Sequence, residues 1–392
     1  MSRHFRSSLL GVALVFSFGL PSPGASQAHY ATLGEPIFVF GEGEGNPSEL
    51  LGRVSAVAGL EQGLWAIGDA LSHTIHIVDD SGALVTSLGG PGDGPGEFRT
   101  IAQRGLWALP DGGLGAWDPR AGRVTYFTGE RFEEIETISV QQDGGIGRPD
   151  MFIGALREGL LIASTVGGAL SGGNPGPSPD HHEVGLFTLD GRFIRKVAEL
   201  EGFVRARSGV PPMVTIGPIA FSPIAMVARG SDQVAFTNGE HREIEVLNAA
   251  GAIRSIRVEA GATITRNQAW RELDELARDE DAVSGFWATS ISTQDRSIGP
   301  VPTLGAVVGG ASHLWVQAYE VSRHAMPFRS GTRGGGGGNW TVYDWSGGLV
   351  GTVRVPDDFV LMTVSDRWVA GIRTDPTGVE SFTVFYNPVD RD

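Results

Sequence analysis

The chain contains no cysteine, which excludes disulfides, thiolate metal ligands and lipid attachment at a cysteine. Lysine is almost missing as well, because Lys196 is the only one in 392 residues. Acidic side chains outnumber basic ones by 45 to 30, which gives a formal net charge of −15. Such a surface repels phosphate backbones, so nucleic acid is not an expected partner.

Long apolar runs are also missing, except within the first 28 residues, which carry the three parts of a signal peptide. These parts are a positive start (Arg3, Arg6), an apolar core (Leu9–Leu20) and small residues for cleavage (Ser26-Gln27-Ala28). The alternative is an uncleaved membrane anchor. We expect an exported protein, periplasmic or extracellular, whose residues 29–392 form one domain without a transmembrane segment. Removal of residues 1–28 takes away two arginines and no acid, so the net charge becomes −17.

Glycine and proline are abundant by contrast. The chain has 58 Gly and 22 Pro, while 41% of its residues are hydrophobic. It therefore holds too many turn formers for a helical protein and too many apolar residues for a disordered one. This composition favours many short strands joined by turns.

A glycine-rich segment occurs twice, 48 residues apart. The chain reads F-G-E-G-E-G-N-P-S-E-L over Phe40–Leu50 and L-G-G-P-G-D-G-P-G-E-F over Leu88–Phe98, with proline and glutamate in register. A repeat near fifty residues predicts stacked or radial units, none of which can bury its apolar face alone.

Six clusters of short strands match that repeat, and each is interpreted as strands A to D of one unit. The expected strands are Val54–Ala58, Leu64–Gly68, Thr74–Val78 and Leu84–Leu88; Gly113–Trp117, Arg123–Phe127 and Phe132–Ile138; Met151–Leu156, Leu160–Thr165, Val184–Leu189 and Phe193–Leu200; Gln233–Asn238, Glu243–Leu247 and Ala252–Val258; Leu314–Tyr319, Trp340–Asp344 and Leu349–Val355; and Val360–Val364, Trp368–Arg373 and Ser381–Tyr386.

The last unit lacks a strand D, whereas a spare strand, Pro36–Phe40, precedes the first unit. Pairing between the two would close a ring and cover both sheet edges. We therefore expect an all-β, six-bladed β-propeller with four-stranded antiparallel blades, closed by the N-terminal strand.

Three segments carry a resemblance to a known family. Gly89–Phe98, Gly105-Leu106-Trp107 and Leu114–Asp118 resemble the NHL-repeat type of six-bladed β-propeller found in exported bacterial proteins, and Leu314-Trp315-Val316 is similar to their fifth blade. The resemblance covers about Leu33 to Val389 and implies the fold, but it says almost nothing about activity. Units three, four and six have lost the glycine-rich signature.

Long insertions all belong to the B-to-C and D-to-A connections, which emerge on one side of a propeller, here called the loop-rich face. The A-to-B and C-to-D turns lie on the opposite side, the turn face. The insertions are Val166–Glu183, Glu201–Gly217, Ala260–Val301 and Glu320–Asn339. Function is usually carried by such loops on a rigid scaffold.

The insertion at about residues 260–301, between blades 4 and 5, contains a predicted helix. Thr265 and Gln268 form a capping box, and Trp270, Leu273 and Leu276 share one stripe. The helix would either cover the ring as a partial lid or plug the mouth of its channel.

Five histidines lie in B-to-C connections of four blades and are candidate metal ligands: His73, His181, His182, His241 and His324. Three imidazoles could bind zinc and leave a position for water. Amidating lyases, which resemble this chain as NHL-type propellers, use three histidines and one metal. The histidines here do not match that family's ligands one by one, and its disulfides are absent, so surface histidines are the simpler interpretation.

Calcium is the other metal considered. Gly92-Asp93-Gly94 and Glu97 offer two carboxylates, whereas a calcium loop needs several at alternate positions. We therefore expect a structural turn in which Glu97 accepts backbone N–H groups. No cofactor is predicted, although zinc or calcium stays open.

Five arginines on the loop-rich face are candidate ligands for an anionic group: Arg205, Arg207, Arg323, Arg329 and Arg333. The chain has no Gly-x-Ser-x-Gly elbow, Walker loop, His-Glu-x-x-His helix or hydride-transfer fingerprint. The leading hypothesis is a non-catalytic exported propeller whose loop-rich face binds a protein or a surface glycan. The alternative is a metal-dependent lyase or lactonase with its site over the central channel.

Overall fold

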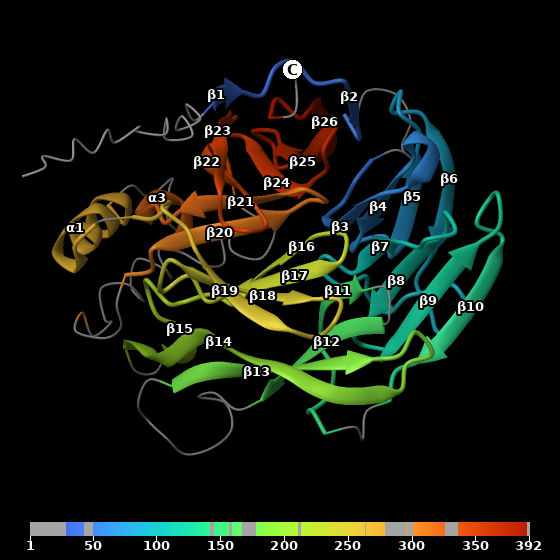
Figure 1. Cartoon of the computed structure of the whole chain (residues 1–392), viewed down its shortest axis with the longest axis horizontal. Helices are drawn as coiled ribbons and strands as arrows, with labels where there is room; N and C mark the ends of the chain where they lie inside the picture. The colour runs from blue at the N-terminus through green and yellow to red at the C-terminus, as the bar shows by residue number, and fades with distance from the viewer. Residues whose placement is uncertain are drawn as a thin grey trace, which may run out of the picture.

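The structure is a computed structural model that describes residues 29–42, 50–141, 145–156, 159–166, 178–210, 213–262, 264–278, 296, 301–325 and 336–389. The expected signal peptide and residues 43–49 of the first glycine-rich segment lie outside these ranges. Within them, six antiparallel sheets stand around a common centre as the blades of a propeller (Figure 1). The fold class predicted from the sequence is therefore confirmed.

The blades follow the chain in order, with the first strand of each nearest the centre (Figure 1). They consist of β3 (Val54–Gly59), β4 (Trp65–Asp69), β5 (Thr74–Val78) and β6 (Leu84–Gly89); β7 (Leu106–Ala108), β8 (Leu114–Asp118), β9 (Arg123–Thr128) and β10 (Glu134–Ser139); β11 (Met151–Leu156), β12 (Gly159–Val166), β13 (Ser178–Phe187), β14 (Phe193–Val210) and β15 (Met213–Pro218); β16 (Met226–Arg229), β17 (Gln233–Thr237), β18 (Glu243–Asn248) and β19 (Ile253–Arg257); β20 (Leu304–Gly309), β21 (His313–Ala318), β22 (Gly338–Asp344) and β23 (Leu349–Val355); and β24 (Phe359–Val364), β25 (Trp368–Thr374) and β26 (Glu380–Tyr386).

The N-terminal strand closes the ring, as predicted. β2 (Phe38–Phe40) pairs antiparallel with β26, and Phe40 lies opposite Phe382. Phe38 and Phe40 are buried, because their rings enter the apolar cluster between blades 6 and 1. A further strand, β1 (His29–Thr32), was not predicted; it adds to blade 5 by pairing parallel to β23.

Apolar side chains fill the spaces between neighbouring blades. Six clusters of buried residues occur in the described structure, and each draws its members from two adjacent blades. Between blades 1 and 2, for example, Ile75 and Ile77 of β5 pack with Leu106 and Phe127. Each blade is therefore held by both of its neighbours, and none has an independent core.

The second glycine-rich segment forms a tight loop before blade 2. Phe98 is fully buried, and its amide donates to the Gly90 carbonyl at 2.8 Å. Gly89 has φ +89° and faces the Phe98 ring, where a Cβ would approach within 2.8 Å, so the position requires glycine. Oε2 of Glu97 accepts the Gly94 amide at 2.7 Å, the contact expected of Glu97 in a structural turn.

A buried carboxylate ends strand β4 and organises the loop-rich side of blade 1. Asp69 accepts the amides of Arg53, Leu71 and Gly52 at 2.8, 2.9 and 3.0 Å, and the Ser72 hydroxyl at 2.9 Å. Burial alone would raise the pKa of Asp69, but these hydrogen bonds outweigh it and hold the pKa below its ordinary value. Asp118 takes the same place in blade 2 and accepts three backbone amides.

The C-to-D turns on the turn face are short, as predicted. Oδ1 of Asp79 accepts the amides of Ser81 and Ala83, both at 2.9 Å. Asp344 does the same for Ser346 and Gly348. Glycine with positive φ follows in each turn, at +84° for Gly82 and +94° for Gly347.

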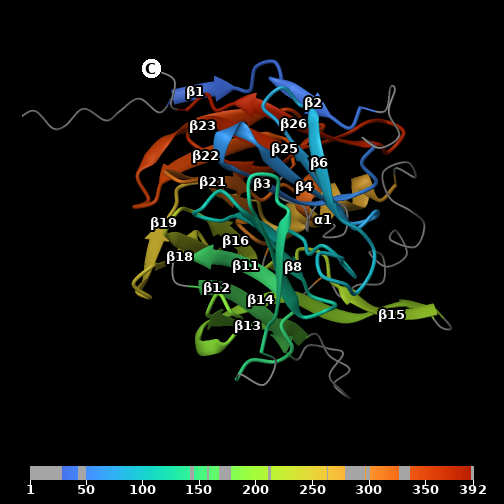
Figure 2. The ribbon, with the colours of Figure 1, turned by 90° about the vertical axis from the view of Figure 1, so that its right-hand side faces the viewer.

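Blade 3 differs from the expectation. The insertions predicted as loops are partly strand, because β13 begins at Ser178 and β14 continues for 18 residues to pair with β15. The added hairpin projects beyond the ring (Figure 2). Val210 and Met213 are the last paired residues of this hairpin.

Candidate functional site

Three connections on the loop-rich face pack together into a small second layer. Its helix α1 (Arg266–Leu276) has the predicted capping box, in which Thr265 and Gln268 satisfy each other's backbone amides. The buried members, here called the loop-side layer, are Ala220, Phe221, Ala269, Trp270, Leu273, Tyr319, Val321 and Ala325. They come from three connections: the one between β15 and β16, the one between β19 and β20, and the one between β21 and β22.

Aromatic rings hold the layer together. The Trp270 and Phe221 rings meet edge to face with centroids 5.0 Å apart, and Tyr319 lies 6.5 Å from Phe221. Figure 1 shows α1 beside α3 (Val321–His324), at the outer edge of the ring and away from its centre. The described helix is therefore neither the lid nor the plug that was expected.

His324 and Arg323 are structural members of this layer. Nε2 of His324 lies 3.2 Å from Oε1 of Gln317, and Nδ1 lies 2.9 Å from the Glu320 amide nitrogen. Burial lowers the pKa of His324 to about 4, so the imidazole is neutral at physiological pH. Arg323 donates to Glu320 and to Asp357, both at 2.7 Å, and thereby ties α3 to the connection before β24.

The other candidate histidines come from three blades: His73 precedes β5, His181 and His182 are neighbours in β13, and His241 lies between β17 and β18. Nδ1 of His73 donates to the Phe98 carbonyl at 2.9 Å, whereas His181 and His241 are exposed. His182 is buried, with Nδ1 3.1 Å from the Thr165 hydroxyl. In the ranges that the structure describes, no three His, Asp or Glu side chains are grouped as a metal would require. The proposed calcium ligand Asp93 is paired with Arg99.

A cavity of about 290 Å³ lies where blades 2, 3 and 4 meet under the loop-rich face. Its polar wall is built on the extension of blade 3: Nε of Arg205 donates to both carboxylate oxygens of Asp180, at 3.0 and 2.7 Å. Burial lowers the pKa of the neighbouring His182, although the Asp150 and Asp180 carboxylates oppose this shift. Phe203 and Phe152 add apolar wall. The structure therefore brings Arg205 and His182 together, at a pocket that already holds a counter-charge.

The remaining arginine candidates are not joined to that pocket by any described contact. The backbone of Arg207 pairs with Ile216 in the projecting hairpin. Arg329 and Arg333 lie outside the described residues.

Exposed apolar side chains mark the loop-rich face over blades 1 and 6, a feature that the sequence analysis did not single out. Leu71 is 72% exposed, Leu50 45% and Val379 38%. The three lie on neighbouring loops, because Leu71 packs against Gly52 and the bridge between Leu51 and Glu380 joins the other two. Leu50 and Val379 also line one surface depression of about 920 Å³. We call Leu50, Leu71 and Val379 the apolar patch.

Comparison with known proteins supports the fold. No known protein-family model matches the chain, and no curated protein shows significant sequence similarity to it. A Bacteroides fragilis protein assigned as exported is similar over 91% of this chain and 98% of its own, with 13% identity and a TM-score of 0.51. At this identity the similarity establishes the propeller architecture alone.

Two further solved structures are more distantly similar. Virginiamycin B lyase from Staphylococcus aureus is covered over 95% of its length, with 10% identity and a TM-score of 0.36. Hydrazine synthase from Kuenenia stuttgartiensis is covered over 84%, with 11% identity and a TM-score of 0.40. Among the described residues, no helix is both long and apolar enough to span a membrane.

Proposed function

We propose that this protein is an exported, non-catalytic β-propeller of the NHL type that binds a protein or a surface glycan through its loop-rich face. The observation that carries the proposal is the loop-side layer, in which three connections from different parts of the chain bury Trp270, Leu273 and Tyr319 on one side of the ring. The shared core gives these three connections one fixed arrangement, as expected for a binding surface carried by loops on a rigid scaffold.

The difference between the two faces supports the same proposal. The turn face consists of short turns, while the loop-rich face has the layer and the projecting hairpin of β14 and β15 (Figure 2). Export is proposed from the N-terminal pattern of residues 1–28. It is tested by fractionation and by the N-terminal sequence of the secreted product.

Binding is tested with the labelled mature protein and envelope fractions of the bacterium that encodes it. Leu71→Glu places a charge in the apolar patch, and we expect it to weaken retention on the envelope at least tenfold. Leu189→Glu is the matched control, because Leu189 is 46% exposed in a C-to-D turn on the turn face. Equal retention of both variants, or equal loss, would refute the assignment to the loop-rich face.

Treatment of the envelope separates the two partner classes. Protease digestion abolishes retention if the partner is a protein, and periodate oxidation abolishes it if the partner is a glycan. Leu71→Glu lowers retention in either case, because it changes the propeller and not the partner.

A further inference from the structure

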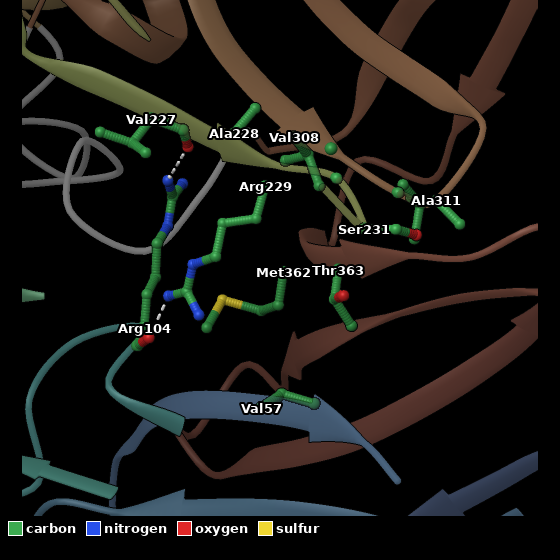
Figure 3. A pocket seen from close by; sticks show the side chains of 14 residues that line it. Val57, Arg104, Val227, Ala228, Arg229, Ser231, Val308, Ala311, Met362 and Thr363 are labelled. Atoms are coloured by element: carbon green, nitrogen blue, oxygen red, sulfur yellow. Dashed lines mark hydrogen bonds between the residues drawn. The ribbon is translucent and has the colours of Figure 1, made fainter. Parts of the chain in front are cut away.

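The centre of the ring contains a second cavity, of about 260 Å³, here called the channel cavity. Its walls come from the inner strands of blades 1, 4, 5 and 6, together with Arg104 from the loop before β7 (Figure 3). Ser231 and Ala311, in the A-to-B turns of blades 4 and 5, line it as well, so the cavity lies toward the turn face. It is therefore separate from the loop-side layer and from the apolar patch.

Arg104 and Arg229 both line this cavity, and the side chain of each reaches toward the backbone near the other (Figure 3). Nη1 of Arg104 donates to the Val227 carbonyl at 2.7 Å. Arg229, the last residue of β16, donates to the Leu106 carbonyl at 3.2 Å and to the Arg104 carbonyl. Its guanidinium also stacks over the Phe152 ring of blade 3, 4.8 Å from the centroid. The two arginines thus connect blades 2 and 4 across the innermost strand of blade 3.

The acceptors of both guanidinium groups are neutral. Within the described ranges neither Arg104 nor Arg229 forms an ion pair, and their hydrogen bonds go only to backbone carbonyls. Burial lowers the pKa of Arg104, and burial together with the Arg104 charge lowers the pKa of Arg229 to about 9. Arginine side chains stay protonated in proteins, so both guanidinium groups are cations in surroundings that disfavour charge. Two cations that share a cavity without a carboxylate are costly unless an anion joins them.

The guanidinium groups keep donors for such an anion. A guanidinium has five N–H groups, and the bonds above engage one of Arg104 and two of Arg229. Both residues line the cavity (Figure 3). Apolar side chains of Val57, Val308 and Met362 also line the cavity, together with Thr363 (Figure 3). A ligand that fits both parts has an anionic head and an apolar body.

We propose that the channel cavity binds a small organic acid, with its carboxylate on Arg104 and Arg229 and its apolar body against Val57, Val308 and Met362. Planar guanidinium groups bind carboxylates through paired, charge-assisted hydrogen bonds. The cavity has room for about nine water molecules at roughly 30 Å³ each, which limits the ligand to the size of hexanoate or benzoate. This site does not depend on the function proposed for the loop-rich face.

The first test compares acids with their uncharged amides by titration calorimetry and thermal unfolding at pH 7 and constant ionic strength. Hexanoate and benzoate should bind saturably and raise the Tm, whereas hexanamide and benzamide should not. Equal binding of acid and amide would overturn the role of the arginines. Inorganic phosphate that bound as tightly as hexanoate would overturn the role of the apolar wall.

The second test removes one charge. Arg229→Met should weaken hexanoate binding at least tenfold. Arg123→Met is the matched control, because Arg123 also donates to two carbonyls, of Asp93 and Glu97, but does not line the cavity. Its hexanoate affinity should equal that of the wild type.

A third variant keeps the proposal testable if loss of Arg229 impairs folding. Ser231 is exposed and lines the cavity, so Ser231→Phe should fill its opening without disturbing a buried contact. Hexanoate affinity should fall at least tenfold in this variant too. Wild-type affinity in folded Ser231→Phe, or in folded Arg229→Met, would overturn the proposal.

Discussion

The ring and the loop-side layer are held together in different ways. The ring has six apolar clusters in the described residues, and each joins two adjacent blades, so every blade contributes to two of them. The layer has one cluster, which takes only a few residues from each of three connections. A break in the ring therefore exposes cores on both sides of the broken blade, whereas a break in the layer exposes one. We expect the ring to unfold as a unit and the layer to open separately.

The largest effect is expected where the ring closes. Phe40→Ala removes a phenyl side chain that is buried between blades 6 and 1, where Phe40 is 2% exposed. It should lower the free energy of unfolding by about 3–5 kcal/mol. Tyr30→Ala in β1 is the control, because Tyr30 is 64% exposed, and it should cost less than about 0.5 kcal/mol. Urea unfolding measures both. Similar losses would mean that β2 does not close the ring.

The carboxylate at the end of β4 should have the next largest effect. Asp69→Asn replaces an acceptor of several backbone amides, and should cost on the order of 1–3 kcal/mol at pH 7. The control is Asp80→Asn, in an exposed turn residue, which should change little.

The stability effect of Asp69→Asn should depend on pH. The folded-state pKa of Asp69 is lowered, so its contribution is complete above the unfolded value of about 3.9 and is lost as the pH falls through the lower folded value. The difference in the free energy of unfolding between wild type and Asp69→Asn should therefore become smaller below about pH 4. A difference that stays constant down to pH 2 would show that the carboxylate charge is not involved.

A smaller and local effect is expected in the loop-side layer. Thr265→Ala removes the capping hydroxyl of α1 and should destabilise the helix by about 1 kcal/mol. Hydrogen exchange in Arg266–Leu276 should become about fivefold faster, while the urea midpoint of the ring stays unchanged. A parallel shift of the urea midpoint would show that ring and layer unfold together.

The smallest effect is expected at an exposed ion pair on the outer strands of blade 4. Nη1 of Arg257 lies 2.6 Å from Oε1 of Glu243, and the two side chains are 70% and 45% exposed. Glu243→Gln should change the free energy of unfolding by less than about 0.5 kcal/mol, because solvent screens the pair. A loss above 1 kcal/mol in urea would mean that the outer edge of the blade contributes more than its exposure indicates.

The ring was predictable from the sequence because its rules are local. Strand alternation, the Asp–Gly turns at Asp79 and Asp344, and the buried Phe98 of the glycine-rich loop each need only a short stretch of chain. The missing last strand and the spare strand expected at Pro36–Phe40 then predicted the closure, which β2 makes with β26. β1 was missed, because a short strand that pairs parallel with residues 351–354 leaves no local signal.

The candidate sites were less predictable because they depend on distant partners. Arg205 was selected as an anion ligand, but Asp180, 25 positions earlier, already neutralises it. Arg104 and Arg229 stand in no motif, and only the ring brings them together. The capping box of α1 was visible in the sequence. The position of the helix at the outer edge was not, because its contacts with Phe221 and Tyr319, from other connections, determine that position.

The most direct test of the account is a hydrogen-exchange footprint of the protein bound to its purified envelope partner. We predict protection at Leu71, around Val379 and in Arg266–Leu276, on the loop-rich face. The turns Asp79–Gly82 and Asp344–Gly348, on the opposite face, should exchange as in the free protein. Protection confined to those turns would contradict the central claim that the loop-rich face is the binding surface.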